Sequence, residues 1–254
     1  MRILTANEAW FSFKGISCRD YSVRMVSPPT RLHPARKGEY IDIPGADGEV
    51  WLDGGGHKPT IISVHCIAED NLNIDAINAW LSGGGELIFG DEPERAYKAN
   101  ITSEYARNNL YGVMRGQEFT VSFDCEPYRY KADTSGDTCS INVAYPLGGG
   151  TTIQNNGSVA SLPLLAVGTS TGDCSITIDG KTMTVKHHEK TIFVDCAAKI
   201  AYTKNDDGTY ESAAMYVSGD WLSIPPGMIF VGVDPGDTAG NSVALTITPR
   251  WRWL

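Results

Sequence analysis

One pentapeptide of the chain has the spacing of a hydrolase nucleophile. The sequence GTSTG at residues 168–172 matches GxSxG, in which a serine stands on a sharp turn between a strand and a helix. Asp179 and His187 follow Ser170 in the order that these hydrolases use. The next segment, Cys174–Ile178, favours another strand, so the required helix is missing. We therefore predict a hairpin turn here, and an esterase built on Ser170 is the weakest function considered.

A second candidate is a metal site at His187-His188-Glu189. On a strand, His187 and Glu189 would share one face while His188 points away. Structural zinc sites have four ligands, and the sequence nominates no further ones. We therefore expect an exposed polar strand end and no metal.

Three tryptophans and two acidic pairs are weaker candidates for a sugar-binding or catalytic site. Trp221, Trp251 and Trp253 have rings that can stack on sugars, but large aromatic residues in a β-sandwich lie more often in its core. Two acidic pairs, Asp91-Glu92 and Asp206-Asp207, lie next to Pro or Gly and are predicted to be solvated loops. None of these residues is assigned a catalytic role.

The glycine-rich segment Glu39–Pro59 is a candidate phosphate loop. Such a loop ends in Gly-Lys-Ser/Thr immediately before a helix, whose N-terminus helps to hold the anion. Here a histidine separates the glycines from Lys58, and the run Thr60–Val64 is typical of a strand. The pattern therefore excludes a phosphate loop.

The same segment fits a β-hairpin. Tyr40–Ile43 alternates apolar and polar residues, Pro44–Gly48 has turn composition, and Val50–Leu52 resumes extended structure. We expect a flexible joint at Gly54-Gly55-Gly56 after the second strand.

Short apolar runs separated by turn signals predict a chain made mostly of strands. In the first half we expect strands at Trp10–Phe13, Tyr21–Val26, Ile41–Ile43, Val50–Leu52, Ile61–Ile67, Leu87–Phe89 and Glu118–Asp124. In the second half we expect them at Thr138–Val143, Gly150–Ile153, Leu162–Val167, Cys174–Ile178, Lys181–Val185, Thr191–Asp195, Ala213–Tyr216, Met228–Val233 and Ser242–Thr248. This spacing is typical of an antiparallel sandwich.

One segment has a helical period. Over Asn73–Leu81, Asn73 can cap the N-terminus, and Ile74, Ile77 and Leu81 fall on one face. Further along, the polar stretch 128–137 separates the two halves and predicts a domain boundary.

The composition excludes several function classes. The net charge is -9 and the pI is about 5.0, which disfavours specific nucleic-acid binding because phosphate recognition needs clustered Lys and Arg. A partner with basic patches fits better. No apolar run approaches the ~18 residues of a membrane span, and the N-terminal residues lack the pattern of a secretory signal. We therefore expect no membrane partner and folding in the cytoplasm of the cell that makes the chain.

The six cysteines are scattered singly through predicted strands, without a CxxC pair. A chain of this size does not need disulfides to hold a core. We expect buried free thiols.

Taken in order, a series of short motifs resembles the distal tail protein of long-tailed bacteriophages. In the first half they are Phe13-Lys14-Gly15, Asp20-Tyr21, Ile43–Gly48, Ala79-Trp80-Leu81, Leu87-Ile88-Phe89, Tyr97-Lys98-Ala99 and Gly116–Tyr128. In the second half they include Asn155-Asn156-Gly157, Leu162-Pro163, Ile178-Asp179-Gly180 and Ile247–Trp251. Each motif consists of turn and core residues, so their order over nearly the whole chain carries the resemblance.

The resemblance implies a mainly β fold. Residues 1–131 would form an N-terminal β-sandwich-like ring domain with one helix and a hairpin arm. Residues 132–254 would form a C-terminal galectin-like antiparallel β-sandwich, whose last strand packs either there or back on the first domain. The residue run with which true galectins bind sugar is absent, so no lectin residues are transferred.

The resemblance also implies a function without catalysis, cofactor or metal. The chain would be the structural hub of a phage or prophage tail tip, assembled in the cytoplasm of the bacterial host. It would form a homo-hexameric ring, single or stacked in two, that joins the major tail tube protein to a tail-associated lysin or baseplate hub protein.

The hairpin is the predicted ring contact, because exposed strands offer unpaired N–H and C=O groups to a neighbour. The candidate residues are Ile41, Ile43, Pro44, Gly45, Asp47 and Gly48. The alternative function is a carbohydrate-binding host-adhesion module, which predicts solvent-exposed aromatic residues in the second half.

Overall fold

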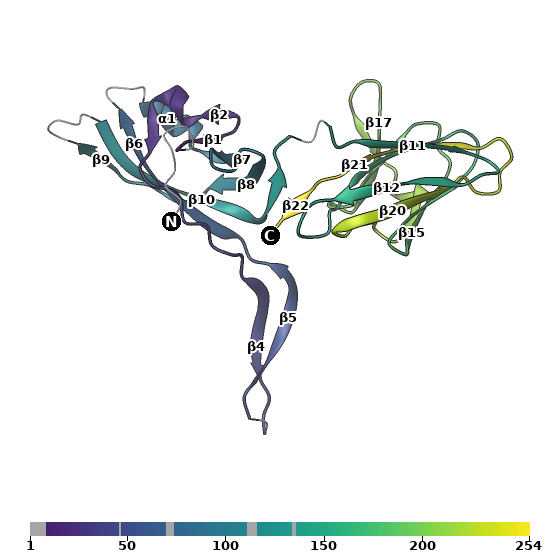
Figure 1. Ribbon diagram of the computed structural model, residues 1–254, viewed down its shortest axis with the longest axis horizontal. Coiled ribbons are helices and arrows are strands. Elements are labelled where there is room, and N and C mark those ends of the chain that lie inside the picture. The colour runs from purple at the N-terminus through teal and green to yellow at the C-terminus, as the bar shows by residue number, and fades with distance from the viewer. Residues whose placement is uncertain (1–8, 46, 70–73, 111–115, 134–135) are drawn as a thin grey trace. The chain divides into compact units, whose positions relative to one another are not determined.

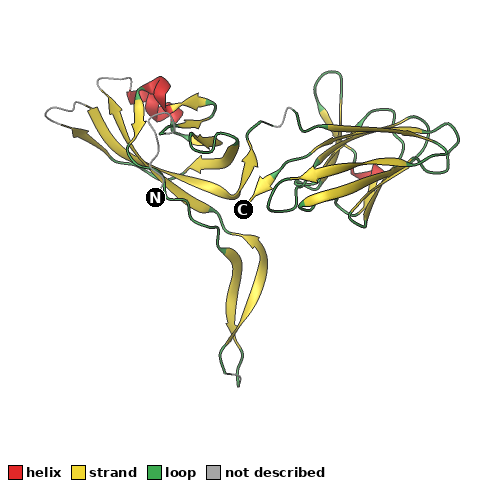
Figure 2. Cartoon of the chain, in the orientation of Figure 1, coloured by secondary structure: helices red, strands yellow, loops and turns green. Residues whose placement is uncertain are grey.

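The structure is a computed structural model that describes residues 9–45, 47–69, 74–110, 116–133 and 136–254 (Figure 1). The chain divides into two compact units, Met1–Ala132 together with Leu254, and Asp133–Trp253. Strands dominate both units, as Figure 2 shows, and the described residues contain one α-helix, α1 (Ile74–Trp80). The predicted mainly β fold is therefore confirmed.

The first unit contains one antiparallel sheet whose central strand is long. In spatial order its strands are β2 (Ile16–Ser17), β1 (Phe11–Phe13), β7 (Gly83–Phe89), β8 (Arg95–Ile101), β10 (Gly116–Lys131), β6 (Thr60–Glu69) and β3 (Val23–Met25), and β9 (Arg107–Leu110) also pairs with β10. A short 3₁₀ turn, Cys18–Tyr21, connects β2 to β3. Both ends of the main strand order are short strands, which limits unwanted edge pairing.

The core of the first unit lies on one face of this sheet. Strand alternation buries Ile62 and Val64 of β6 beside Phe123 of β10, and α1 covers them with Trp80. The Trp80 indole stacks on Phe11 with centroids 5.6 Å apart, and its Nε1 donates a hydrogen bond of 2.8 Å to the carbonyl oxygen of Phe13. The helix thus closes the core. The predicted cap, Asn73, lies outside the described residues.

A separate two-stranded sheet extends from the first unit (Figure 1). It consists of β4 (Arg36–Asp42) and β5 (Glu49–His57), and we refer to this hairpin as the arm. The glycines expected to form a flexible joint lie inside β5. They form a bulge, because Arg36 pairs with His57 and Gly38 with Asp53, so three glycines of β5 face one residue of β4.

The second unit is a sandwich of two antiparallel sheets. One has the order β11 (Cys139–Ala144), β21 (Ser242–Thr248), β13 (Leu164–Thr169), β16 (Ile192–Asp195), β17 (Ile200–Lys204) and β18 (Tyr210–Ser212). The other has the order β12 (Gly149–Asn155), β20 (Gly227–Asp234), β14 (Cys174–Ile178), β15 (Lys181–Val185) and β19 (Val217–Gly219). A two-residue strand, β22 (Arg252–Trp253), follows near the end of the chain.

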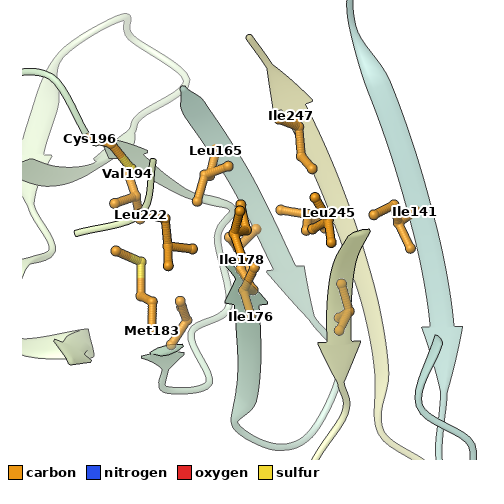
Figure 3. Packing of buried hydrophobic residues seen from close by; sticks show 14 of the residues in the cluster. Ile141, Leu165, Ile176, Ile178, Met183, Val194, Cys196, Leu222, Leu245 and Ile247 are labelled. Carbon is orange, nitrogen blue, oxygen red and sulfur yellow. The ribbon is translucent and has the colours of Figure 1, made fainter. Parts of the chain in front are cut away.

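The inward-facing residues of these two sheets form a single core (Figure 3). Leu165 and Leu245 come from one sheet, and Ile176 and Ile178 come from the other; all four are fully or almost fully buried. Burying such a side chain contributes roughly 1.5–3 kcal/mol, so the interface between the sheets is the main source of stability in this unit.

One strand predicted in the second half was wrong. Ala213–Tyr216 is not a strand but contains a 3₁₀ turn, Ala214–Tyr216, in which the Tyr216 amide donates to the Ala213 carbonyl oxygen. Met215 there is 77 % exposed, whereas Ala213 is buried in the core and Tyr216 packs against it, so the side chains do not alternate as in a strand. In the polar stretch 128–137, β10 continues past a bulge as far as Lys131 and pairs again with β8. The two compact units divide between Ala132 and Asp133, inside this stretch.

Candidate interaction surface

The arm has two faces of different chemistry. Residues paired across an antiparallel ladder point to the same side. Ile41 pairs with Val50, and Leu52, which pairs with Glu39, lies on the same side. Ile41, Val50 and Leu52 form an aliphatic face, and Glu39 lies at its end nearer the base of the arm. Tyr40 pairs with Trp51 and lies on the opposite face.

The aliphatic face is open to solvent. Ile41 is 40 % exposed, Val50 54 % and Leu52 54 %. Ile43, just beyond the end of β4, is 45 % exposed. An apolar surface of this kind, gathered on a projecting element, marks an interaction site in soluble proteins.

The opposite face is aromatic and acidic. Tyr40 and Trp51 meet edge to face with centroids 4.9 Å apart, and the next pair along the ladder is Asp42 with Glu49. The Trp51 ring lies over Gly38, where a Cβ atom would come within 2.3 Å of the indole Cζ2 and 2.6 Å of the Leu52 carbonyl oxygen. A side chain at position 38 would therefore displace the indole or the backbone of the arm.

The base of the arm is held by Asp53. Its carboxylate accepts a hydrogen bond of 3.1 Å from Arg36 and one of 2.9 Å from the Gly55 amide. Gly55 and Gly56 have φ values of +70° and +79°, which glycine adopts without steric cost. These contacts hold the backbone of the bulge at the base of the arm.

The structure places the predicted contact residues at the tip of the arm. Ile41, Ile43, Pro44, Gly45, Asp47 and Gly48 are all exposed. Gly45 and Gly48 have φ values of +86° and +84°, which are typical of glycine in a turn. Ala46, between them, lies outside the described residues.

Sequence reasoning missed Val50 and Leu52 as members of the surface. The signal was present in the alternation of Val50, Trp51 and Leu52, but which of them joins Ile41 depends on the register of the hairpin. A one-residue shift would have put Trp51 on the aliphatic face instead.

The GTSTG segment is a connection and does not have the geometry of a nucleophile elbow. It follows β13 in one sheet and leads to β14 in the other, so the prediction of a hairpin turn was wrong. Ser170 Oγ accepts a hydrogen bond of 2.8 Å from the Ser242 amide, whereas His187 Nδ1 lies 3.0 Å from Thr169 Oγ1. Asp179 lies in the turn between β14 and β15.

The metal candidate also has a structural explanation. His187-His188-Glu189 lies in the loop after β15, and the His188 ring packs against Tyr216 with centroids 4.7 Å apart. Within the described part of the chain, no group of three or more His, Cys, Asp or Glu residues could hold a metal ion.

The remaining sequence candidates have mixed outcomes. Trp251 is buried in the core of the second unit, and Trp221 and Trp253 pack against that core.

Of the two acidic pairs, Asp206-Asp207 is exposed as predicted, but Asp91-Glu92 is only partly exposed and is not a solvated loop tip. Asp91 accepts two hydrogen bonds, of 2.8 and 2.6 Å, from Arg31. The Arg31 guanidinium lies over the Phe89 ring, so this acidic pair serves the first unit's structure.

All six cysteines are free, as predicted, and five are buried. No helix among the residues that the structure describes is long and apolar enough to cross a membrane.

Comparison with known proteins identifies the fold. No family model matches the sequence, and no curated protein matches it. Among solved structures, the chain is similar to the crystal structure of the Dit protein (gp 19.1) of SPP1, described as a paradigm of the hub adsorption apparatus in phages that infect Gram-positive bacteria. The TM-score is 0.62 at 19 % identity, over 93 % of this chain and 97 % of that chain. The resemblance to distal tail proteins is thus confirmed at the level of fold: the chain has a Dit-like fold.

Proposed function

We propose that the chain is a structural hub of a phage tail tip. The observation that carries this proposal is the match in fold to a hub adsorption protein over nearly the full length of both chains. A chance structural match would more often cover one of the two units than both units in the same chain order. The function needs no catalytic site, cofactor or metal.

The arm is the contact that closes a homo-oligomeric ring. A two-stranded hairpin is marginally stable in water on its own, so a projecting arm gains from a surface that covers it. Covering Ile41, Val50 and Leu52 would contribute roughly 1 kcal/mol for each half-exposed side chain. The two strands also present unpaired backbone groups along their outer edges, with which a neighbouring copy can extend the ladder.

The ring is a hexamer, alone or as two stacked rings, at the tip of the virion tail. Its partners are the major tail tube protein on one side and a tail-associated lysin or baseplate hub protein on the other. Assembly takes place in the cytoplasm of the bacterial host. The acidic balance of the chain, with a net charge of -9, suits partners with basic surfaces better than it suits the genome that passes through the tail.

Electron microscopy of phage particles tests this assignment. A gold-labelled antibody fragment raised against the chain should label the tail tip of the particles that carry it. Labelling along the tube or on the capsid, or particles that contain none of the chain, would contradict the proposed function.

A further inference from the structure

The second unit has a hollow to which the proposed hub function assigns no role. It has a volume of about 600 Å³ and lies on the outer face of the sheet formed by β12, β20 and β14. The loop containing Tyr145 and Pro146 and the loop after β20 also line it. The hollow is therefore built from several segments that are distant in the sequence.

Two adjacent glycines lie at the floor of the hollow. Gly150 of β12 pairs with Gly232 of β20, and Gly232 pairs in turn with Thr177 of β14. Two glycines side by side on the solvent face of a sheet leave a trough, because every other pairing on that face carries a side chain. The third member of the row, Thr177, is exposed and supplies a hydroxyl group.

An exposed aromatic ring leans over this floor. Phe230 is 62 % exposed, although it lies in the middle of β20. A Cβ atom at Gly150 would lie 2.4 Å from Phe230 Cζ, so the ring occupies the space that the glycine leaves free. One side of the ring is thus held against the sheet while much of its surface remains in solvent.

The lining also contains acidic and hydroxyl-bearing residues. It includes Asp234 and Asp237 from the loop side and Tyr145, which is 40 % exposed, from the opposite loop. Neither Lys nor Arg lines the hollow. An anionic ligand would be repelled by the two carboxylates, whereas a neutral ligand with hydroxyl donors would bind to them.

We propose that this hollow binds a neutral saccharide. A pyranose ring has one face of C–H groups, which packs on the electron-rich face of Phe230, and a rim of hydroxyls, which reach Asp234 and Thr177. This combination of an apolar platform and a few polar groups is typical of small-ligand sites. The inference stands on the second unit alone and does not rest on the hub function.

The test uses the full chain and a panel of sugars. Saturation-transfer NMR with the methyl glycosides of glucose, galactose, mannose and N-acetylglucosamine should show transfer to at least one of them. Glucuronate should show none, because of its charge. Absence of transfer to every neutral sugar, or preferential transfer to glucuronate, would overturn the proposal.

Variants in β20 distinguish stacking of a sugar on Phe230 from nonspecific binding to exposed apolar residues. Phe230→Ala and Phe230→Leu should weaken binding of the sugar found by about tenfold or more, while Phe230→Trp retains it. Met228→Ala is the matched control, because Met228 lies on the same face of β20 and is 74 % exposed. Equal binding by Phe230→Ala and wild type, or an equal loss in Met228→Ala, would contradict the assignment.

A comparison of two ligands distinguishes a surface glycan from a free saccharide. If purified cell-wall polysaccharide binds more tightly than the methyl glycoside, the ligand is a surface glycan; equal affinity per sugar unit indicates a free saccharide. If Phe230→Ala changes the mass of the assembly while no sugar binds, the face is a protein contact and the proposal is wrong.

Discussion

Ile41 and Val50 lie directly opposite each other on one face of the arm, and they are 40 % and 54 % exposed. The backbone hydrogen bonds between β4 and β5 hold this pair in place, but its side chains remain in contact with water. Burying them against another apolar surface would lower the free energy. The two residues therefore mark the centre of the surface that we assign to contact between copies.

A charge at this centre should prevent assembly. Val50→Asp would place a carboxylate among apolar groups, so we expect the dissociation constant between copies to rise by at least about a hundredfold. The far-UV circular dichroism should not change, because Val50 does not contribute to either core. Met215→Asp is the matched control, since Met215 is 77 % exposed and lies in the second unit. Equal loss of assembly in both variants would contradict the role of the arm.

Two glycines of the arm should respond differently to alanine. Gly38→Ala would force the Trp51 ring or the Leu52 backbone to move, because its Cβ would lie within 2.6 Å of both. At Gly54 the nearest atom to an added Cβ is 3.5 Å away, which is ordinary contact. Limited proteolysis should therefore cut the arm of Gly38→Ala faster than that of wild type. Gly54→Ala should match wild type, and equal cleavage of the two variants would show that the packing of Trp51 does not order the arm.

The ion pair between Asp195 and Arg250 should make the second unit sensitive to acid. Burial alone would raise the pKa of the Asp195 carboxyl, but hydrogen bonds from Arg250 and from the amides of Ala198 and Ala197 outweigh it and lower this pKa. A lowered pKa stabilises the folded state at pH values above the unfolded pKa, near 3.9, and this stabilisation is lost as the pH falls through the folded value.

The expected contribution is about 1 kcal/mol, because Arg250 is partly exposed and water screens the pair. The free energy of unfolding of the second unit, measured with urea at several pH values, should fall less on acidification in Asp195→Asn than in wild type. Arg250→Gln should behave like Asp195→Asn. If the free energy of unfolding falls on acidification by the same amount in both variants as in wild type, this ion pair is not the cause of the acid sensitivity.

Cysteine reactivity should report on burial. Burial raises the pKa of Cys196 to about 11 and those of Cys125 and Cys174 to about 12. It also raises the pKa of Cys18 and of Cys66. Since the thiolate is the reactive form, iodoacetamide at about pH 8 should modify Cys139 first, as it is only partly buried. Mass spectrometry should show one fast adduct in the native protein, and all six after denaturation. Several fast adducts on the folded chain would contradict the packing of the cores.

Strands with clean alternation could be predicted from the sequence. Ser242–Thr248 has the predicted bounds, because Val243, Leu245 and Ile247 alternate with residues that point away from the core. Strand β8 was missed, because Arg95 and Lys98 interrupt its apolar pattern. The connection from β13 to β14 was misread as a hairpin because local turn composition does not specify which sheet the next strand joins.

The candidate surface was predictable only in part. Turn composition located the hairpin, since Gly45 and Gly48 need left-handed backbone. The pairing of Ile41 with Val50, and the exposure of both, depend on register and on what lies nearby, neither of which is encoded locally. The saccharide hollow was not predicted because Gly150, Gly232 and Phe230 meet only through the pairing of β12 with β20.

The mass of the purified full chain in solution, measured by light scattering with negative-stain images of the same peak, tests the central claim most directly. The account predicts a mass that is a sixfold or twelvefold multiple of the 27.5 kDa chain, seen as rings with a central channel. A monomer at concentrations well above those of phage assembly, with no rings in the images, would contradict the proposal that the arm closes a ring.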